Sequence, residues 1–316
     1  MKPKRVKVYA PATIANLCAG FDVLGIALET PGDSVMATRT ANKEFRFSVE
    51  TTFLNIPISI EDNVAAYVSS KMMDELKLPF GIEMVLHKSM PVGSGLGSSG
   101  ASSVAAAVAV NALLDKPLTK KELLHFAIEG ERKASGTAHV DNVAPSLFGG
   151  ACIVLNEKSL DVVSFPVHND ITWIVIHPHT TIATSDARRI LPTTVPLSDV
   201  TCQMGNVSGL VLGLIQGDAE LIHKCMVDHI AEPVRQSFIP GFIEMKQAAM
   251  ASGAIGCGIS GSGPSVFAVT LARDKAERIA KQMIFALAKA EGIKADIYIS
   301  QTNCQGAIVT ESKDEV

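Results

Sequence analysis

The sequence predicts an α+β fold with two domains, and three observations lead to this prediction. The chain has 316 residues, more than the ~250 to 300 at which a single hydrophobic core usually stops growing. Apolar residues make up 47% of it and charged residues 19%, as is typical of a globular protein. Strand-like and helix-like segments follow one another in mixed order, which favours α+β over a doubly wound parallel sheet.

The first half of the chain is expected to combine strands with three helices. Segments rich in Val, Phe or Thr predict strands at residues 5–10, 23–29, 34–39, 45–50, 82–87, 151–155 and 162–167. One helix should run from Asp62 or Asn63 to Leu76, and a second from the end of the glycine-serine segment, residues 91–103, to Leu114.

The third helix has the clearest start signal in the sequence. Thr119 and Glu122 have the spacing of a capping box, and Leu118 and Leu123 flank them as a hydrophobic staple. The helix is expected to end near Gly136, because glycine is common just after a helix C-terminus.

The second half is expected to be mostly helical after a strand at residues 172–177. Helices are predicted at residues 198–215, 219–229, 240–250 and 274–291, and strands at residues 265–270 and 296–300. We expect a domain boundary near residues 166–170, which divides the chain into residues 1–165 and 166–316.

Charge and segment lengths exclude several classes of protein. The formal net charge is −4 and no dense Lys/Arg run follows the first seven residues, so a general nucleic-acid binder is not expected. The longest uncharged stretch, residues 89–114, is strongly apolar only from Val104 onward, which suits a buried helix better than a membrane span. The amino terminus lacks the apolar segment of a secretory signal, and a cytoplasmic protein is expected.

The cysteines and histidines do not indicate a metal centre. Cys18, Cys152, Cys202, Cys225, Cys257 and Cys304 are scattered without a Cys-x-x-Cys pair, which suits reduced packing residues. His177 and His179 form a His-x-His pair, but no further ligand lies nearby in the sequence.

The segment PVGSGLGSSGASS, residues 91–103, lies between a predicted strand and a predicted helix and is a candidate anion site. Its glycines allow several backbone N–H groups to converge on phosphate oxygens, and the helix adds the positive end of its dipole. A tight packing turn is the alternative, but such a turn needs no hydroxyl groups. Ser98, Ser99, Ser102 and Ser103 therefore favour a site for phosphate and Mg²⁺.

Two other nucleotide-binding loops fit this segment poorly. It contains no Gly-Lys-Ser/Thr, so it is not a Walker A loop. Gly95, Gly97 and Gly100 satisfy Gly-x-Gly-x-x-Gly, but a dinucleotide fold needs a second strand that ends in an acidic residue. Asp115 has about the right offset, yet it lies in a turn before another helix.

One carboxylate falls on the apolar face of the third helix. The stripe formed by Leu123, Leu124, Ala127 and Ile128 leads, three or four residues on, to Glu131. A carboxylate aimed at the interior is costly unless it is paired or holds a cation, so Glu131 is a candidate Mg²⁺ ligand. The alternatives are a side chain that reaches solvent at the helix end or pairs with a neighbouring lysine.

Polar residues also interrupt the segment AHVDNVAPSLFGG, residues 138–150, which we expect to be an apolar loop before a strand. His139, Asp141 and Asn142 gather there. Such clusters more often build a site than a bare turn, although Asp-Asn is also ordinary turn chemistry.

Four motifs, in this order along the chain, resemble those of the GHMP kinase superfamily and within it most closely the homoserine kinase family. They are PATIANLCAGFD (residues 11–22), the phosphate-loop pattern of Pro91, Gly95, Leu96, Ser98 and Ser99, the HVDNVAP segment (residues 139–145) and GISGSGPSVFA (residues 258–268). Two departures affect the first motif: Ile14 stands where the family usually has Ser, and Cys18-Ala19 replace a stretch usually richer in glycine.

The resemblance implies a GHMP kinase-like fold, with an N-terminal mixed β-sheet and helix domain that binds ATP and a C-terminal α+β domain that completes the substrate cleft. It also implies transfer of the γ-phosphoryl group of ATP to the side-chain hydroxyl of L-homoserine, a step of threonine biosynthesis, by a homodimer. ATP is then expected to bind Pro91, Gly93, Ser94, Gly95, Leu96, Gly97, Ser98, Ser99 and Gly100. Ser99, with Ser98 as the alternative, and Glu131 would hold Mg²⁺.

The resemblance assigns a partner to each polar group of the substrate. Arg188 and Arg235 match the family's carboxylate-binding arginines, whose guanidinium forks suit bidentate recognition. Arg189 is expected to face solvent or pair with an acid. The remaining contacts come in three pairs: Asp22 with Asp141 at the ammonium group, Asn16 with Asn142 at the hydroxyl group, and Thr184 with His139 as second contacts.

The expected catalytic residues are Asn16, Asp141, Asn142 and Arg188, and they should act by positioning and charge stabilisation. Phosphoryl transfer passes through a loose transition state, so a strong general base is not required. Asp141 is the candidate base, but as an exposed aspartate with a pKa of about 3.9 it would be a poor one.

Three alternative functions remain open on the sequence. Mevalonate or shikimate as acceptor would keep the kinase fold, and discrimination depends on Asp22 and Asp141 recognising an ammonium group. A non-catalytic nucleotide-binding regulator would have no need of Glu131. A nicotinamide-dependent oxidoreductase would need the second strand that the glycine-serine segment lacks.

Overall fold

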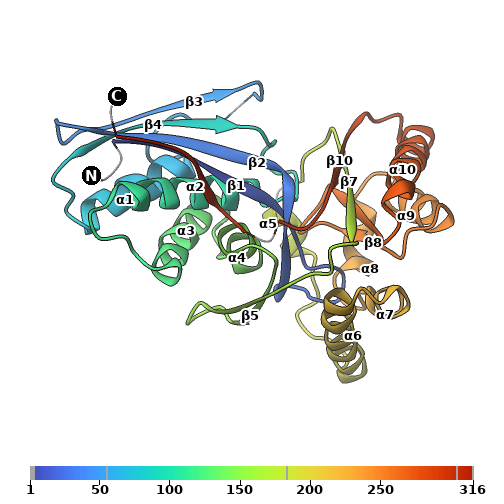
Figure 1. Cartoon of the computed structure of the whole chain (residues 1–316). Coiled ribbons are helices and arrows are strands. Elements are labelled where there is room, and N and C mark those ends of the chain that lie inside the picture. Colours follow the sequence, from blue (N-terminus) through green and yellow to red (C-terminus); the bar gives the residue numbers. More distant parts are fainter. Residues whose placement is uncertain (1–3, 55, 183, 304, 315–316) are drawn as a thin grey trace.

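Two β-sheets organise the chain, and the computed structural model describes residues 4–54, 56–182, 184–303 and 305–314 of it (Figure 1). The strands of the first sheet lie in the order β11 (Ile308–Lys313), β1 (Arg5–Ala15), β2 (Leu24–Thr40), β4 (Gly81–Lys88) and β3 (Phe45–Thr51), and β5 (Ala151–Asn156) and β6 (Asp161–Phe165) extend it from β2. β3 runs parallel to β4, whereas the other pairs are antiparallel, so the sheet is mixed.

The second sheet is antiparallel throughout. Its order is β10 (Ala295–Ser300), β7 (Thr172–Pro178), β9 (Val266–Thr270) and β8 (Gly256–Ile259). One mixed and one antiparallel sheet, each covered by helices, confirm the predicted α+β class. β11 follows the second sheet in sequence but pairs with β1 in the first; the limits 1–165 and 166–316 stay a prediction.

Four helices pack on one face of the first sheet: α1 (Val64–Glu75), α2 (Ser98–Leu113), α3 (Lys120–Ser135) and α4 (Val140–Phe148) (Figure 1). α2 contacts the other three helices as well as β1 and β2, so it forms the centre of this layer. It is apolar nearly all round, as expected for a buried helix. Ala105, Ala106, Ala107 and Ala109 are all fully buried, and such small side chains let neighbouring elements approach closely.

Side chains cap the helices where the sequence predicts. Asn63 accepts a hydrogen bond from the Ala65 N–H at 3.0 Å at the start of α1. Thr119 Oγ1 accepts from the Glu122 N–H at 3.3 Å, and Glu122 Oε2 accepts from the Thr119 N–H at 2.7 Å, so the predicted capping box of α3 is confirmed. Gly136 ends this helix with a left-handed φ of 76°.

The two strands predicted at residues 23–29 and 34–39 are a single strand, β2, so the prediction of two is wrong. Both halves pair with β1, whose Pro11 lies opposite Gly32 and whose Thr13 lies opposite Ala27. Residues 28–31 are accommodated at this irregularity, which bends the strand without ending it.

The apolar loop predicted at residues 138–150 is wrong as well, because the segment forms α4. Val140, Val143, Ala144 and Leu147 have helical spacing, and all four are buried. Pro145 lies inside the helix, where proline removes a hydrogen bond and is usually unfavourable. Burial of the apolar face outweighs that cost.

In the second half, α6 (Leu197–Gln216), α9 (Phe242–Ala251) and α10 (Ala276–Glu291) confirm predicted helices within two residues at each end. α7 (Ala219–Cys225) is shorter than predicted. The chain turns after it, because the Asp228 carboxylate accepts hydrogen bonds from the N–H groups of residues 230–232. Two short helices that the sequence analysis missed, α5 (Thr184–Arg189) and α8 (Glu232–Arg235), carry the predicted arginines.

Membrane-spanning helices, disulfides and metal clusters can be assessed in the described part of the chain. None of its helices is long and apolar enough to cross a membrane. Its five cysteines are free thiols, and Cys304 lies outside the described residues. His177 contacts Ser265 and His179 contacts Asp296, and no cluster of three or more His, Cys, Asp or Glu side chains in these ranges could hold a metal ion.

Candidate active site

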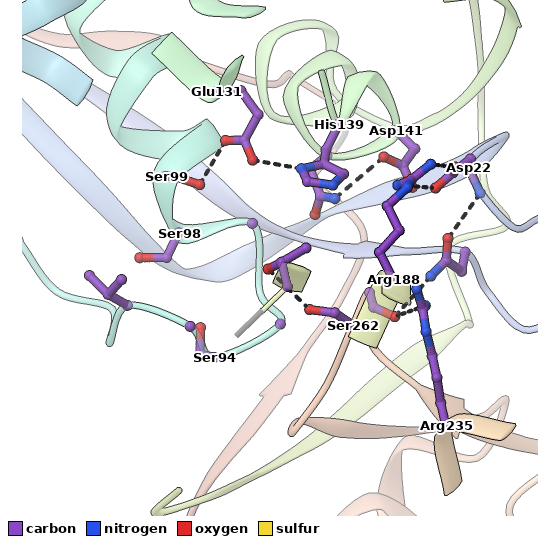
Figure 2. Close-up of a pocket in the computed structure, with 18 residues that line it drawn as sticks. Asp22, Ser94, Ser98, Ser99, Glu131, His139, Asp141, Arg188, Arg235 and Ser262 are labelled. Carbon is purple, nitrogen blue, oxygen red and sulfur yellow. Dashed lines mark hydrogen bonds and ion pairs between the residues drawn. The ribbon is translucent and has the colours of Figure 1, made fainter. Parts of the chain in front are cut away.

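One pocket, between the helices of the first sheet and the short helices α5 and α8, collects most of the predicted site residues (Figure 2). It encloses about 650 Å³, part of it open to solvent, and is lined by Asn16, Asp22, Val92, Gly93, Ser94, Gly95, Gly97, Ser98, Ser99, Glu131, His139, Asp141, Asn142, Thr184, Arg188, Arg235, Gly261 and Ser262. Residues far apart in the sequence therefore meet in one place, as an active site requires.

Three predicted nucleotide contacts, Pro91, Leu96 and Gly100, lie outside this lining. Leu96 is buried and its carbonyl accepts from the Thr13 N–H at 3.0 Å. A Cβ at Gly100 would lie 3.3 Å from the Val143 side chain of α4. Leu96 and Gly100 thus shape the loop and its packing, and the pocket is formed by the residues between and beside them.

Close contacts with neighbouring segments require glycines in the loop. A Cβ at Gly95 would lie 2.5 Å from the Ser260 carbonyl oxygen, and one at Gly97 would lie 2.1 Å from Thr13 Oγ1. Both glycines have positive φ values, 77° and 63°. Gly97 is also the N-cap of α2 and provides no side-chain cap, so the first turn presents its N–H groups at the pocket.

At the start of α2, a row of polar contacts connects three predicted residues, Ser99, Glu131 and His139 (Figure 2). Ser99 Oγ donates to Glu131 Oε2 at 2.7 Å, and Glu131 Oε1 lies 2.9 Å from His139 Nδ1. Glu131 is only 4% exposed, so the alternative in which it reaches solvent is wrong. A hydroxyl and a carboxylate oxygen side by side are the ligand types that Mg²⁺ prefers.

The pKa of His139 is set by burial and by its contact with Glu131. Burial lowers the pKa, but the hydrogen bond to Glu131 and the charges of Glu131 and Asp141 outweigh burial and raise it above the ordinary histidine value. Thr137 Oγ1 lies 3.0 Å from the other ring nitrogen. The imidazolium form therefore holds a positive charge next to Glu131.

The loop after β1 has a left-handed backbone at several non-glycine residues. Asn16, Leu17, Cys18 and Asp22 have φ values of 71°, 45°, 62° and 55°. Cys18 is thus in a conformation that favours glycine, which is the residue type expected around this position. Asn16 stabilises the loop: its Oδ1 accepts from the Asp22 N–H at 3.0 Å and its Nδ2 donates to the Gly261 carbonyl at 2.9 Å.

Two arginines lie at the far end of the pocket from the glycine loop. Arg188 forms an ion pair with Asp22, in which its Nη2 is bonded to Oδ2 and its Nη1 lies 3.4 Å from Oδ1. Arg235 is 5% exposed and donates to the carbonyls of Ala187, at 3.2 Å, and Gly261, at 3.0 Å. Arg189 pairs with Asp186 at 3.2 Å on the exposed side of α5, as predicted.

Asp141 is buried, so the expectation of an exposed aspartate is wrong. It is 3% exposed, and burial, followed by the nearby charge of Asp22, raises its pKa to about 7. Asn142 is fixed beside it: its Oδ1 accepts from Thr13 Oγ1 at 2.9 Å. A carboxylate with this pKa is a much better proton acceptor near neutral pH than an ordinary aspartate.

Comparisons with known proteins agree with this geometry. The models of the GHMP kinases N terminal domain and the GHMP kinases C terminal domain match residues 63–150 and 210–289. A homoserine kinase of Chlorobium phaeobacteroides is 40% identical over 318 residues, which cover 97% of this chain and 99% of that protein. One from Pyrococcus furiosus is 41% identical over 296 residues, 94% of this chain and 97% of that protein. This chain belongs to the homoserine kinase family of GHMP kinases.

Solved structures agree with this family assignment. The crystal structure of homoserine kinase from Cytophaga hutchinsonii matches with a TM-score of 0.92 and 45% identity, and the match covers 97% of each chain. A mevalonate kinase of L. major has a TM-score of 0.73 at 16% identity, a likeness that shows the fold alone. The predicted two-domain GHMP kinase-like fold is thereby confirmed.

Three residues that contribute polar groups to the homoserine kinase site are not among the predicted ones. Gly261 accepts from both Asn16 and Arg235, Ser262 Oγ lies 3.4 Å from Thr184 Oγ1, and Thr13 holds Asn142. All three belong to motifs that resemble the family, at residues 11–22 and 258–268. Their place in these motifs could have identified them. Their own chemistry could not, because a backbone carbonyl or a small hydroxyl group carries no charge that stands out in a sequence.

A second cavity adjoins the first at Val92 and Ser99. Its lining is largely apolar and comes mainly from the segment before α1, from β4 and from α2: Ile56, Pro57, Asp62, Asn63, Val64, Leu86, Lys88, Val92, Ser99, Ser102 and Ala134. Val92, Ser99 and Ser102 belong to the predicted anion-binding segment, whereas the other lining residues, which are dispersed over the first half of the chain, are not among the predicted site residues.

Proposed function

We propose that this protein transfers the γ-phosphoryl group of ATP to the side-chain hydroxyl of L-homoserine and releases O-phospho-L-homoserine. The observation that carries the proposal is the polarity of one pocket. One end presents a glycine loop and a helix N-terminus suited to phosphate, and the other presents arginines and aspartates suited to an amino acid. Relatives named homoserine kinase that match nearly the whole chain support it.

The nucleotide is assigned to the loop and the adjoining cavity. The N–H groups at Gly97 and the first turn of α2 would bind phosphate oxygens, helped by the helix dipole. The second cavity, which meets the loop at Val92 and Ser99, would take the flat apolar base. Asn63 also lines this cavity, but both of its polar atoms are already used: Oδ1 accepts from the Ala65 N–H at 3.0 Å and Nδ2 donates to the Pro57 carbonyl at 2.8 Å.

The family implies Mg²⁺, and the residues present fit it. Ser99 Oγ and Glu131 Oε2 lie 2.7 Å apart at the phosphate end, and His139 adds a positive partner on the other oxygen of Glu131. Ser98 is the poorer candidate, because its hydroxyl points to the Met90 carbonyl at 3.4 Å. When bound, the ion would neutralise charge that develops on the phosphate oxygens.

The amino-acid end is complementary to a zwitterion. Arg188 and Arg235 provide positive charge for the carboxylate, and Asp22 and Asp141 provide negative charge for the ammonium group. Charge-assisted hydrogen bonds of this kind are about twice as strong as neutral ones. Thr184, which contacts Ser262, completes this end of the pocket.

The hydroxyl group of the substrate is assigned to Asn16, Asn142 and Asp141. Gly261 and Thr13 hold the two asparagines, so their amides are preorganised for the attacking oxygen. With a pKa of about 7, Asp141 could accept the hydroxyl proton as the new P–O bond forms and the bond from the γ-phosphorus to the β–γ bridging oxygen breaks, which leaves ADP. Positioning remains the main contribution that we assign to the protein.

Acceptors without an ammonium group fit this site less well. Mevalonate and shikimate have a carboxylate but no positive charge, and they would leave the charges of Asp22 and Asp141 without a ligand partner. A nicotinamide-dependent enzyme is disfavoured because α3, and no strand, follows α2. A homodimer remains a prediction from the resemblance and a cytoplasmic location a prediction from the sequence, and light scattering of the purified protein would test the first.

A coupled ADP-release assay with Mg²⁺ and ATP tests the function across L-homoserine, L-threonine, L-serine, mevalonate and shikimate. Arg188→Met and Arg189→Met form a matched pair, because the two arginines are adjacent on α5 but only Arg188 lines the pocket. We expect turnover with L-homoserine, a KM for it that is about 10- to 100-fold higher in Arg188→Met, and no change in Arg189→Met. Turnover with mevalonate or shikimate alone would refute the amino-acid assignment.

A further inference from the structure

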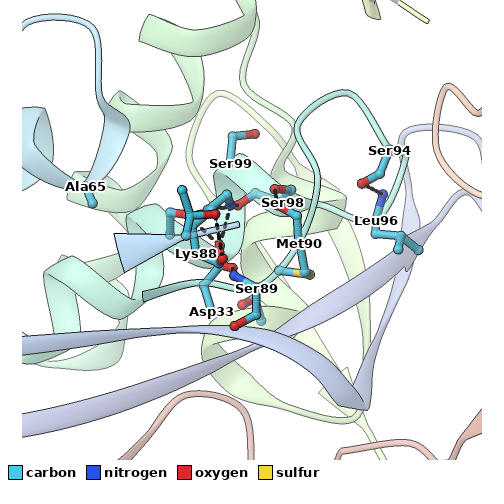
Figure 3. Close-up of polar contacts among 12 residues, drawn as sticks. Asp33, Ala65, Lys88, Ser89, Met90, Ser94, Leu96, Ser98 and Ser99 are labelled. Carbon is cyan, nitrogen blue, oxygen red and sulfur yellow. Dashed lines mark hydrogen bonds and ion pairs between the residues drawn. The ribbon is translucent and has the colours of Figure 1, made fainter. Parts of the chain in front are cut away.

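A buried ion pair lies directly beneath the start of α2 (Figure 3). Lys88, the last residue of β4, is 6% exposed, and Asp33 of β2 is fully buried. Lys88 Nζ is bonded to Asp33 Oδ2 and donates to the Ser98 carbonyl at 2.8 Å and to Ser102 Oγ at 2.9 Å. Neither charged residue lines the phosphate end of the pocket.

Each charge in this cluster has several partners. Asp33 accepts from the Ser89 N–H at 2.9 Å and from Ser102 Oγ at 2.6 Å, in addition to the bond from Lys88. An apolar pair of similar volume often supports a fold as well as a buried ion pair does. Stability alone is therefore a weak explanation for two charges at this depth.

The cluster is connected to both parts of the nucleotide site. Through the Ser98 carbonyl it holds the first residue of α2, next to Ser99 and directly after the glycine loop. Lys88 and Ser102 also line the second cavity, to which we assigned the base. Gly97 gives α2 no side-chain cap, and these contacts from below restrain the position of the first turn, together with the bond between Ser99 and Glu131.

We infer that Lys88 and Asp33 are positioning residues for the nucleotide: they fix the start of α2, so that its N–H groups and the hydroxyl of Ser99 meet the phosphates in a productive geometry. This inference rests on the proposed function for the identity of the nucleotide. A displacement of such a group by about 1 Å can reduce a rate about 100-fold, even when the substituted residue lies away from the reacting atoms.

Two adjacent serines of α2 provide a matched test. Ser102→Ala removes the hydroxyl that links Lys88, Asp33 and the Ser98 carbonyl. Ser103→Ala removes a hydroxyl that is equally buried but has no hydrogen-bond partner among the described residues. Both changes favour a helix, so both variants are expected to fold. Lys88→Met is the stronger variant, and Asp33→Asn keeps the shape of its partner.

The full-length variants should be compared by calorimetric titration with MgADP and by steady-state kinetics. We expect Ser102→Ala to weaken MgADP binding and raise the KM for ATP about 10-fold, and Lys88→Met to do so by up to about 100-fold. The KM for L-homoserine should stay within about twofold, because positioning of the amino-acid end does not depend on the cluster. Ser103→Ala should match the unmodified protein in both measurements.

Three results would overturn the inference. The first is equal nucleotide affinity in Ser102→Ala and Ser103→Ala. The second is a Lys88→Met protein that melts at a lower temperature but binds MgADP normally while folded, which would make the cluster purely structural. The third is a parallel rise in the KM values for ATP and for L-homoserine. The titration needs no acceptor, so it tests the inference even if the unmodified protein fails to phosphorylate L-homoserine.

Discussion

Arg188 and Asp22 bind each other in the structure, although they are assigned to opposite ends of the same ligand. Arg188 contacts both carboxylate oxygens of Asp22, and each side chain remains about one-third exposed, 38% and 34%. An amino acid that enters the pocket brings a carboxylate for the first residue and an ammonium group for the second. We therefore propose that the pair is an internal substitute for a zwitterion and that binding exchanges one set of charge contacts for another.

This exchange predicts a change of specificity in Asp22→Asn. Loss of the negative charge should raise the KM for L-homoserine about 10- to 100-fold, because a charged hydrogen bond is lost while the carboxylate contact remains. An acceptor without the ammonium group, such as 4-hydroxybutyrate, should lose far less. Kinetics with both acceptors measure the effect. An equal loss for the two acceptors would show that Asp22 does not recognise the ammonium group.

Glu131 should control the response to Mg²⁺. In Glu131→Ala we expect kcat to fall about 100-fold or more and the Mg²⁺ concentration for half-maximal activity to rise, since a buried carboxylate ligand is removed. Glu129→Ala is the matched control: Glu129 lies on the same helix, but it pairs with Lys71 and Arg132 at the surface.

A Mg²⁺ titration of the initial rate, with circular dichroism to confirm folding, distinguishes the two variants. Glu129→Ala should retain the Mg²⁺ dependence of the unmodified protein. If Glu131→Ala retains it too, the metal assignment is wrong. Glu131 also raises the pKa of His139, so the imidazole should titrate at lower pH in Glu131→Ala, which NMR can follow.

Most of the fold was predictable because its elements carry their own local signals. The capping box of Thr119 and Glu122 and most of the predicted strands depend on neighbours in sequence, and the structure confirms them. α4 was missed because Pro145 disfavours a helix locally, whereas the burial of Val143 and Leu147 that stabilises it depends on β1 and β2.

The site residues were predictable only in part, for a related reason. Glu131 could be found because a carboxylate on an apolar helix face is a local contradiction. The burial of Asp141 was not predictable, because it comes from elements that are distant in sequence: a Cβ at Gly25 of β2 would lie 1.8 Å from its carbonyl oxygen. The pairing of Lys88 with Asp33 is equally non-local, since 55 residues separate the two.

The raised pKa of Asp141 predicts a pH dependence with a defined sign. Burial and then Asp22 raise this pKa to about 7, so the side chain is protonated below that pH and can neither bind an ammonium group nor accept a proton. kcat/KM for L-homoserine, which reports groups of the free enzyme, should therefore fall as pH decreases through about 7.

The same pKa affects stability in the opposite direction. A carboxyl group whose pKa is higher in the folded than in the unfolded state stabilises the fold while it is protonated, and this contribution is lost as pH rises through the folded pKa. Asp141→Asn should therefore melt at a temperature a few degrees higher than the unmodified protein at pH 8, and the difference should shrink toward pH 4. Equal melting temperatures at pH 8 would contradict the buried, raised pKa.

Gly97 offers the most direct test of the loop geometry. Its left-handed φ of 63° costs about 1 to 2 kcal/mol for most other residues, and a Cβ would also lie 2.1 Å from Thr13 Oγ1 and 2.9 Å from Asn142 Oδ1. Gly136, which ends α3, has a similar φ of 76°, but a Cβ there meets nothing within 4 Å.

Gly136→Ala should therefore lower the free energy of unfolding by only about 1 to 2 kcal/mol and leave the KM values unchanged. Gly97→Ala should lose more stability and also weaken ATP binding, because Thr13 and Asn142 must move away from the loop. Urea denaturation and ATP kinetics of the two variants measure both effects, and equal losses of stability with unchanged ATP kinetics would show that the loop tolerates a side chain at its centre.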